Sequence, residues 1–195
     1  MSDKVKLKPS VVGYTMPVAV LGTEIAGKPS FMTVAWLARV NYQPPMMAVA
    51  IGRSHASYEA VKSNGTFSVS FPALEQRVEA DYVGIVSAAK VDKSAVFEVF
   101  RGELAGAPMV KSCPVTMECK IAETVDLPTN TLFVGEVVSI WADQDVTNDR
   151  GPVDLSKARP LLLSMPDNRY WQVGEPVGRA WRDGKDYAPD RGEES

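Results

Sequence analysis

The residue types that carry most acid–base, nucleophilic and metal chemistry are scarce in this chain. Its 195 residues include one histidine, so His55 is the only imidazole for a Ser-His or Cys-His nucleophile pair. Neither Ser54 nor Ser57 lies in a G-x-S-x-G motif. One histidine also rules out a metal site built from several histidines, and the spacing of Cys113 and Cys119 lacks the paired short intervals of a zinc site. The sequence therefore gives little support to hydrolase or metal chemistry.

Two common nucleotide-binding fingerprints are absent as well. None of the 14 glycines forms part of a G-x-G-x-x-G or a G-x-x-x-x-G-K-[ST] motif, so neither a Rossmann dinucleotide site nor a P-loop is predicted. On an extended strand, Cys113 and Cys119 lie about 20 Å apart. That distance is too long for a disulfide, and we predict two structural thiols.

One stretch has the residue types of an anion site. The apolar run Met46–Ile51 leads into Gly52 and then into residues 53–57, at the start of an expected helix. A helix N-terminus offers unpaired N–H groups and the positive end of the helix dipole. Arg53 can add a charge-assisted contact, and two serine hydroxyls add further donors. These residues are compatible with a phosphate site, but spacing alone slightly favours the alternative, an ordinary capped helix with a solvated Arg53.

A second stretch precedes it along the chain. Met32, Thr33, Ala35 and Trp36 come before a turn at Pro44-Pro45. Small residues and threonine let a flat ligand lie against the backbone, whose N–H and C=O groups can bond a polar ring edge. A core hairpin with a buried Trp36 explains the same residues, and chemistry alone favours that hairpin.

The elements that position these stretches are mostly strands. Helices are expected over residues 54–65, ending at Asn64-Gly65, and over 74–86. Leu74, Val78, Tyr82 and Ile85 form one apolar stripe on the second helix, which we expect to be buried. The strands do not alternate regularly with helices, which favours an antiparallel barrel or sandwich over a doubly wound parallel sheet. Strand character is found in residues 17–21, 31–37, 46–51, 67–71, 115–122 and 132–141, with Gly135 predicting a bulge or a close backbone approach.

Composition and charge exclude some classes of partner. Hydrophobic residues make up 45% and charged residues 23%, which is ordinary for a globular domain. A net charge of −3 calls for neither nucleic acid nor an anionic membrane. The N-terminus lacks the apolar core of a signal peptide, and no apolar run approaches the roughly 20 residues that span a bilayer. We therefore expect a cytoplasmic protein with no nucleic-acid or membrane partner.

A series of short motifs resembles one known family in content and order. The chain is similar, over roughly residues 8 to 178, to flavoredoxin-like proteins of the flavin reductase-like FMN-binding split-barrel family. The resemblance implies a mainly β fold with inserted helices, namely a six-stranded antiparallel Greek-key split barrel. It also implies a homodimer with non-covalent FMN near the dimer interface. The motifs are PVAVLGT, FMTVAW, NYQPPMMAVAIGRSHASY, NGTFSVSF, DYVGIVS, VDKSAVF, CPVTMECK, LFVGEV and RYWQVGE.

The resemblance implies domain boundaries and site residues too. The FMN-binding split-barrel domain would span residues 1–178, and residues 179–195, which include Trp181 and Tyr187, would form a polar tail or a dimer arm. The residues expected around the FMN phosphate are Arg53, Ser54, His55 and Ser57. Those expected along the ring are Met32, Thr33, Val34, Ala35 and Trp36. Further candidates are Asn64, Phe67, Tyr82 and Lys93, with Tyr170 and Trp171 closing the pocket.

The activity implied by the resemblance is that of a flavin reductase-like oxidoreductase. Electrons from NAD(P)H or a redox protein would pass through FMN to an acceptor, and no catalytic side chain is required. Asn130 departs from the family, since many flavin reductases carry a histidine there, and it keeps open a non-catalytic flavin carrier or interaction module. Ser30-Phe31 replaces Asn-Ile, and Ser87-Ala88-Ala89 stands where Ser-Gly is expected. A split barrel that binds another phosphorylated ring, such as pyridoxal phosphate, is a further alternative.

Overall fold

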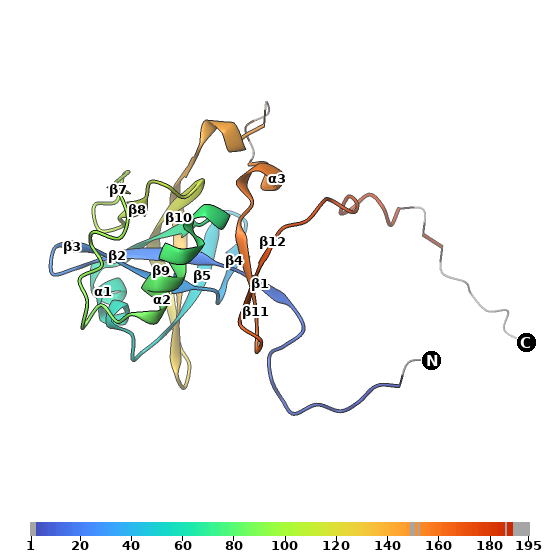
Figure 1. Ribbon diagram of the computed structural model, residues 1–195, viewed down its shortest axis with the longest axis horizontal. Helices are drawn as coiled ribbons and strands as arrows, with labels where there is room; N and C mark the ends of the chain where they lie inside the picture. The colour runs from blue at the N-terminus through green and yellow to red at the C-terminus, as the bar shows by residue number, and fades with distance from the viewer. Residues whose placement is uncertain (1–2, 149–150, 152, 186, 189–195) are drawn as a thin grey trace, which may run out of the picture.

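The computed structural model describes residues 3–148, 151, 153–185 and 187–188. Figure 1 shows a body made mostly of strands, from which both terminal segments extend. The helices are α1 (Ala56–Asn64), α2 (Arg77–Ile85) and α3 (Leu155–Ala158), with 3₁₀ turns η1 (Leu74–Gln76) and η2 (Gln144–Val146). The strands are β1 (Thr15–Pro17), β2 (Ala19–Ile25), β3 (Lys28–Val34), β4 (Leu37–Asn41), β5 (Met46–Gly52), β6 (Thr66–Phe71), β7 (Val99–Phe100), β8 (Met109–Val110), β9 (Val115–Asp126), β10 (Asn130–Ala142), β11 (Leu161–Ser164) and β12 (Arg169–Gln172).

The mainly β antiparallel barrel is confirmed, although its sheet has seven strands where the family resemblance implied six. A seven-stranded sheet has the order β3-β2-β6-β9-β10-β5-β4, and all of its neighbouring strands run antiparallel. Its two edge strands, β3 and β4, are consecutive in the chain, so the sheet curls round to bring its ends together as a split barrel. A smaller sheet of β1, β11 and β12 lies at one side of this barrel (Figure 1).

The strand expected over residues 31–37 is divided, and that prediction was wrong. β3 ends at Val34 after pairing with β2, whereas β4 starts at Leu37 and pairs with β5. The carbonyl of Trp36 already accepts a hydrogen bond from Ala50 N at 2.9 Å. Ala35 and Trp36 therefore connect one edge of the sheet to the other. A continuous strand over these residues could not pair with β2 at its start and with β5 at its end.

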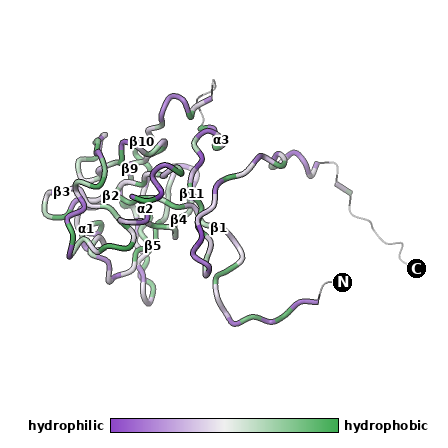
Figure 2. Tube along the Cα trace, viewed as in Figure 1, coloured by the Kyte–Doolittle hydropathy of each residue, from purple (hydrophilic) through white to green (hydrophobic). Residues whose placement is uncertain are grey.

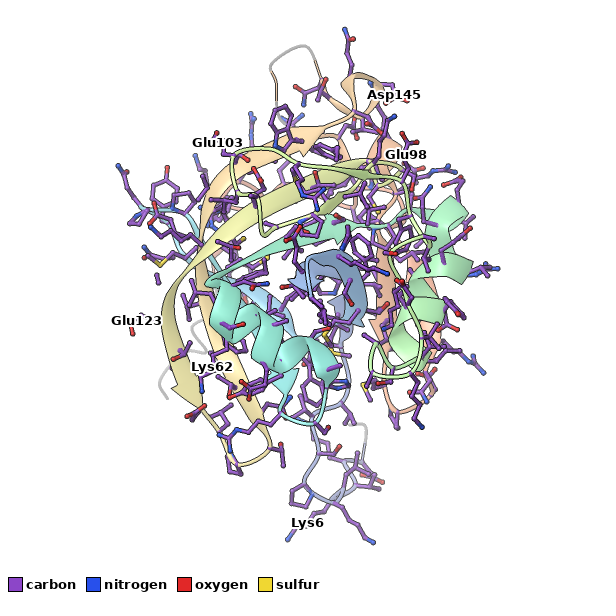
Figure 3. The ribbon with its side chains drawn as sticks, turned by 90° about the vertical axis from the view of Figure 1, so that its left-hand side faces the viewer. Lys6, Lys62, Glu98, Glu103, Glu123 and Asp145 are labelled. Atoms are coloured by element: carbon purple, nitrogen blue, oxygen red, sulfur yellow. The ribbon has the colours of Figure 1, made fainter. Side chains whose placement is uncertain are left out.

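The barrel interior is filled by large apolar side chains and by one face of α1. Phe67 and Phe133 are fully buried there with Tyr58 and Val61 of α1. In Figure 3 the long strands β9 and β10 curve around this helix, which carries the labelled Lys62. The bulge predicted at Gly135 is confirmed, since the register of β10 shifts beside it. The close neighbour is a side chain and not a backbone, because a Cβ there would lie 2.8 Å from the Phe67 ring.

The apolar stripe of α2 faces outward, and its predicted burial was wrong. Val78 and Ile85 are 66% and 74% exposed, whereas Ala80 and Val83 are fully buried beside Phe31 of β3. The helix packs through its small residues because they let it approach the sheet closely. This arrangement leaves the four stripe residues, Leu74, Val78, Tyr82 and Ile85, partly or largely exposed on the surface.

The predicted thiols are confirmed as free and buried. Burial raises the pKa of Cys113 and of Cys119 to about 12, with smaller contributions from Asp143 and Glu118 respectively. Both are therefore inert structural side chains at neutral pH.

Both extended terminal segments mix hydrophilic and hydrophobic stretches (Figure 2). Of the tail expected over 179–195, residues 179–185, 187 and 188 are described and exposed, and the rest lies outside the described residues. Within the described part of the chain, no helix has the length and apolar character to cross a membrane.

Candidate functional site

A cavity of about 230 Å³ lies where three segments that are distant in sequence meet. These segments are the end of β3, the start of α1, and the end of α2 with the loop that follows it. Two of them are the stretches that the sequence analysis selected for ring and phosphate binding. The lining residues are Met32, Thr33, Ser54, His55, Ala56, Ser57, Val83, Gly84, Ile85, Val86, Ser87, Ala88 and Lys93.

The start of α1 presents free donors to this cavity. His55 is its N-cap residue and makes no side-chain capping hydrogen bond. Tyr58 N donates to His55 O at 3.0 Å, which leaves the N–H groups of Ala56 and Ser57 without an acceptor among the described residues. Ser57 is 3% exposed, and among the described residues neither its hydroxyl nor that of Ser54 has a hydrogen-bond partner. The helix ends at Gly65, whose φ of 66° confirms the predicted stop. The first turn therefore has the polarity of an anion site.

Lys93 brings a buried positive charge to the same cavity. Its side chain is almost fully enclosed, and Nζ donates to Phe31 O at 2.9 Å and to Val83 O at 2.7 Å. These bonds tie β3 to α2. Burial lowers the Lys93 pKa, and no described carboxylate forms an ion pair with it. An ammonium with two neutral partners leaves its charge uncompensated, which favours an anionic ligand nearby.

Thr33 and Gly84 set the width of the cavity between β3 and α2. The Thr33 hydroxyl donates to the carbonyl of Ala80, and a Cβ at Gly84 would lie 3.0 Å from Thr33 Cβ. A larger residue at position 84 would push the end of α2 away from β3. Glycine therefore keeps this wall of the cavity in place.

Arg53 points elsewhere, toward the turn between β9 and β10. Its Nη2 donates to Leu127 O at 2.8 Å and lies 3.4 Å from Asp126 Oδ1. A hydrogen bond from Thr131 and the charge of Arg53 lower the pKa of Asp126. Arg53 does not line the cavity. Its Nε and Nη1 groups have no hydrogen-bond partner among the described residues, so they stay available as donors to a ligand. Its predicted phosphate contact stays a prediction.

Ala35 and Trp36 line a different hollow of about 410 Å³, which they share with Ala48, Ala50 and Leu132. Trp36 is 52% exposed, so the hairpin with a buried Trp36 is not what the chain forms. Val34 lies between the two hollows with its side chain buried in the barrel core. The segment 32–36 therefore borders both spaces.

The remaining candidates lie outside the lining of the cavity. Asn64, at the far end of α1, donates to Thr23 Oγ1 and to Glu24 O at 3.0 and 2.9 Å. Phe67 is fully buried inside the barrel, and Tyr82 lies on the outward side of α2. Tyr170 donates to Asp81 at 2.7 Å, and Trp171 donates to Ser164 at 2.7 Å. Their binding roles stay predictions.

Sequence reasoning missed the cavity wall formed by residues 83–88. Only Tyr82 was selected from that motif, yet the residues that follow it line the cavity. Val83, Ile85 and Val86 have the composition of an ordinary helix core, which hides a ligand wall. A glycine inside a helix, Gly84, was the one available signal of close approach.

The model of the flavin reductase like domain matches residues 11–167, and the chain belongs to this family. Its fold is therefore that of the flavin reductase-like split barrels.

Among solved structures, flavoredoxin from Methanosarcina acetivorans is 44% identical with a TM-score of 0.91, covering 94% of this chain and 98% of that one. Flavoredoxin of Desulfovibrio vulgaris (Miyazaki F) is 29% identical with a TM-score of 0.87, covering 94% and 100%. A Pseudomonas syringae protein named FMN reductase (NADH) RutF is 27% identical over 143 residues, which are 71% of this chain and 76% of that protein. The chain spans only 57% to 65% of the length of three other curated relatives that it matches.

Proposed function

We propose that the protein binds FMN non-covalently and acts as a flavin reductase-like oxidoreductase of the flavoredoxin type. The observation that carries this proposal is the cavity in which free donors of the α1 N-terminus and the buried Lys93 ammonium face β3. Family membership and the likeness to two flavoredoxins support it.

The residues around the cavity fit such a cofactor. The phosphate would lie at the first turn of α1, where Ser54, Ser57 and backbone N–H groups supply neutral donors. The ring would lie along residues 32–36, which border both hollows. When bound, FMN supplies the hydride and electron chemistry. The protein binds it, orients it and limits solvent access, so no side chain is assigned an acid–base role.

The electron donor is proposed to be NAD(P)H or a redox protein. The name of the Pseudomonas syringae relative supports a nicotinamide donor. Asn130 supports the second candidate function, a non-catalytic flavin carrier, because many flavin reductases carry a histidine at this place and this chain does not. A homodimer and a cytoplasmic location also belong to the proposal.

Spectroscopy of the purified protein tests this function. We expect a titration with FMN to saturate at one flavin per chain, and anaerobic addition of NADH or NADPH to remove the visible flavin absorption. A protein that binds FMN but is reduced by neither nicotinamide would be a carrier or would use a protein donor. A colourless protein that fails to bind added FMN would contradict the proposal, and mass spectrometry of any extracted cofactor would then test pyridoxal phosphate.

Arg53→Ala is expected to weaken FMN binding by about 1.5–3 kcal/mol if the guanidinium contacts the phosphate through its free donors. The matched variant is Asp126→Asn, which removes the ion pair of Arg53 but leaves the guanidinium in place. If Arg53 contacts the phosphate, Asp126→Asn keeps its affinity for FMN. If Arg53 only holds the turn between β9 and β10 in place, Arg53→Ala and Asp126→Asn lose equal affinity for FMN. Titration of FMN into the two variants separates these outcomes.

Lys93→Met is expected to weaken FMN binding at least about 10-fold and to lower the free energy of unfolding by about 2–4 kcal/mol, since it leaves the carbonyls of Phe31 and Val83 unpaired. The control is Lys90→Met, which removes the same charge from an exposed neighbour. Urea denaturation and FMN titration of both variants provide the test. Equal effects of the two substitutions would contradict a specific role for Lys93.

A further inference from the structure

A second cavity, of about 290 Å³, adjoins the cavity proposed for FMN, here called the flavin cavity. The second cavity lies between the start of β3 and the loop that follows α2. It shares Ala88 and Lys93 with the flavin cavity, so the two spaces have a common wall. Its other polar and charged side chains belong to residues that the FMN site does not use, namely Lys28, Ser30, Lys90 and Asp92.

Two of the departures from the family pattern meet in the wall of this second cavity. Ser30 replaces an asparagine, and Ser87-Ala88-Ala89 stands where Ser-Gly is expected. These positions are distant in sequence, yet Ser30, Ala88 and Ala89 all line the one space. Because serine is shorter than asparagine, the replacement also leaves room beside β3. The second cavity is therefore a feature of this chain that the family resemblance does not imply.

Ser30 supplies the observation that points to a ligand. Its residue is 5% exposed, and its hydroxyl has no hydrogen-bond partner among the described residues. A buried hydroxyl without a partner is unfavourable and is rare in folded proteins. Side chains alternate along a strand, so Ser30 lies on the same face of β3 as Lys28, and both line the second cavity. A ligand oxygen in this cavity would give the hydroxyl the partner that it lacks.

The second cavity also carries a surplus of positive charge. Lys28, Lys90 and Lys93 line it, against the single carboxylate of Asp92. That carboxylate is already paired with Lys28 Nζ at 2.9 Å and accepts from Ser94 N at 2.9 Å. Within the described part of the chain, neither Lys90 nor Lys93 forms an ion pair. Two ammonium groups therefore border this space without a protein counter-ion.

We propose that the second cavity binds a phosphate ester, in addition to the flavin phosphate next door. Its oxygens accept hydrogen bonds from the Ser30 hydroxyl, from Lys90, and from the one N–H of Lys93 that its two carbonyl partners leave free. A phosphate suits these donors because it offers several acceptor oxygens and a negative charge that the two ammonium groups balance. The volume leaves room for part of the group that the phosphate carries.

This phosphate ester has two possible sources of the same chemistry. One is the AMP half of FAD, with the flavin half of the same molecule in the adjoining cavity. The other is a free nucleotide that binds beside FMN. The inference rests on the proposed function only for the content of the flavin cavity, and it adds a separate site to it.

Calorimetric titration of AMP into the FMN-loaded protein tests the proposal. We expect one AMP to bind per chain, at least about 10-fold more tightly than adenosine, which lacks the phosphate. Ser30→Ala and Lys90→Met should each weaken AMP binding at least about 5-fold and change FMN affinity less than about 2-fold. Ser30→Ala should not lower the free energy of unfolding, because the hydroxyl that it removes has no partner in the protein. The matched control is Lys120→Met, which removes an exposed lysine that lines neither cavity.

Titration of FAD into the same variants identifies the source. If FAD fills both cavities, Ser30→Ala and Lys90→Met weaken the binding of FAD but not of FMN, and the FAD-loaded protein no longer binds AMP. If the FAD-loaded and FMN-loaded proteins bind AMP equally well, the ester is a free nucleotide.

Two results would overturn the proposal. The first is that neither substitution changes the affinity for AMP or for FAD. The second is that both lower the affinity for FMN as much as that for AMP, since the two cavities would then form one flavin site. A protein that binds no FMN would contradict the proposed function instead, and AMP titration of the flavin-free protein and its variants would still decide the present proposal.

Discussion

Ser57→Asp is expected to weaken FMN binding more than about 100-fold relative to Ser57→Asn. Ser57 is the second residue of α1, and its side chain is buried on the wall of the proposed phosphate site. A carboxylate placed about 5 Å from a phosphate repels it by about 3 kcal/mol or more at an effective dielectric constant near 20. That free energy corresponds to more than two decades in the dissociation constant.

The fold should tolerate this change, because an acidic residue in the first turn of a helix interacts favourably with the helix dipole, by about 0.3–1 kcal/mol. That gain offsets part of the cost of burying the carboxylate. Ser57→Asn is the matched control, since it has nearly the same shape without the charge. Urea denaturation of the three proteins checks that the effect is confined to binding.

Riboflavin lacks the phosphate, so a comparison of its affinity with that of FMN tests whether the phosphate lies near residue 57. The Ser57→Asp variant should lose far more affinity for FMN than for riboflavin, whereas Ser57→Asn should change both only slightly. Titrations that follow flavin fluorescence give all of these constants. Equal losses for the two flavins would mean that the phosphate lies away from the first turn of α1, and the site assignment would have to be withdrawn.

Local patterns in the sequence were sufficient for much of the barrel. The apolar run Met46–Ile51 became β5, Gly65 ended α1, and Gly135 marked a real bulge, because each of these features depends on residues close in sequence. The predicted burial of the apolar stripe of α2 was wrong for a physical reason. Large apolar residues normally face a core, but here the face of α2 toward β3 is formed by Ala80, Val83 and Gly84, and the two small residues let the helix approach the strand closely.

At the site, too, features that depend on neighbouring residues were predicted, whereas contacts between residues distant in sequence were not. The two stretches chosen for ring and phosphate binding do meet at one cavity, since β3 and the start of α1 border it. The orientation of Arg53 was not predictable, because its partners, Leu127 and Asp126, come from a turn much later in the chain. Pairing across a barrel is set by sheet order, which no local pattern contains.

Glu118→Gln is expected to lower the free energy of unfolding by about 2–4 kcal/mol at neutral pH. Glu118 is fully buried on β9, and its carboxylate accepts hydrogen bonds from Glu103 N and Leu104 N, both at 2.9 Å, and from the Ser139 hydroxyl. An amide in its place offers one acceptor oxygen and directs an NH₂ group at donors that already point inward. At least one backbone N–H of the loop 102–104 would then stay unpaired.

The pH dependence of this loss has a definite sign. Burial by itself raises the pKa of Glu118, but hydrogen bonds from Ser139 and from the backbone of Leu104, Glu103 and Gly102 outweigh it and hold the pKa below its ordinary value. A carboxyl group whose pKa is lowered by folding stabilises the native state above its unfolded pKa, and that stabilisation disappears as the pH falls through the folded pKa. The difference between wild type and Glu118→Gln should therefore be largest at neutral pH and should shrink in acid.

Glu123→Gln, at an exposed position on the same strand (Figure 3), should change the free energy of unfolding by less than about 0.5 kcal/mol at every pH. Urea denaturation over a pH series measures both variants, and a loss at Glu118 as small as that at Glu123 would show that the loop 102–104 finds other acceptors.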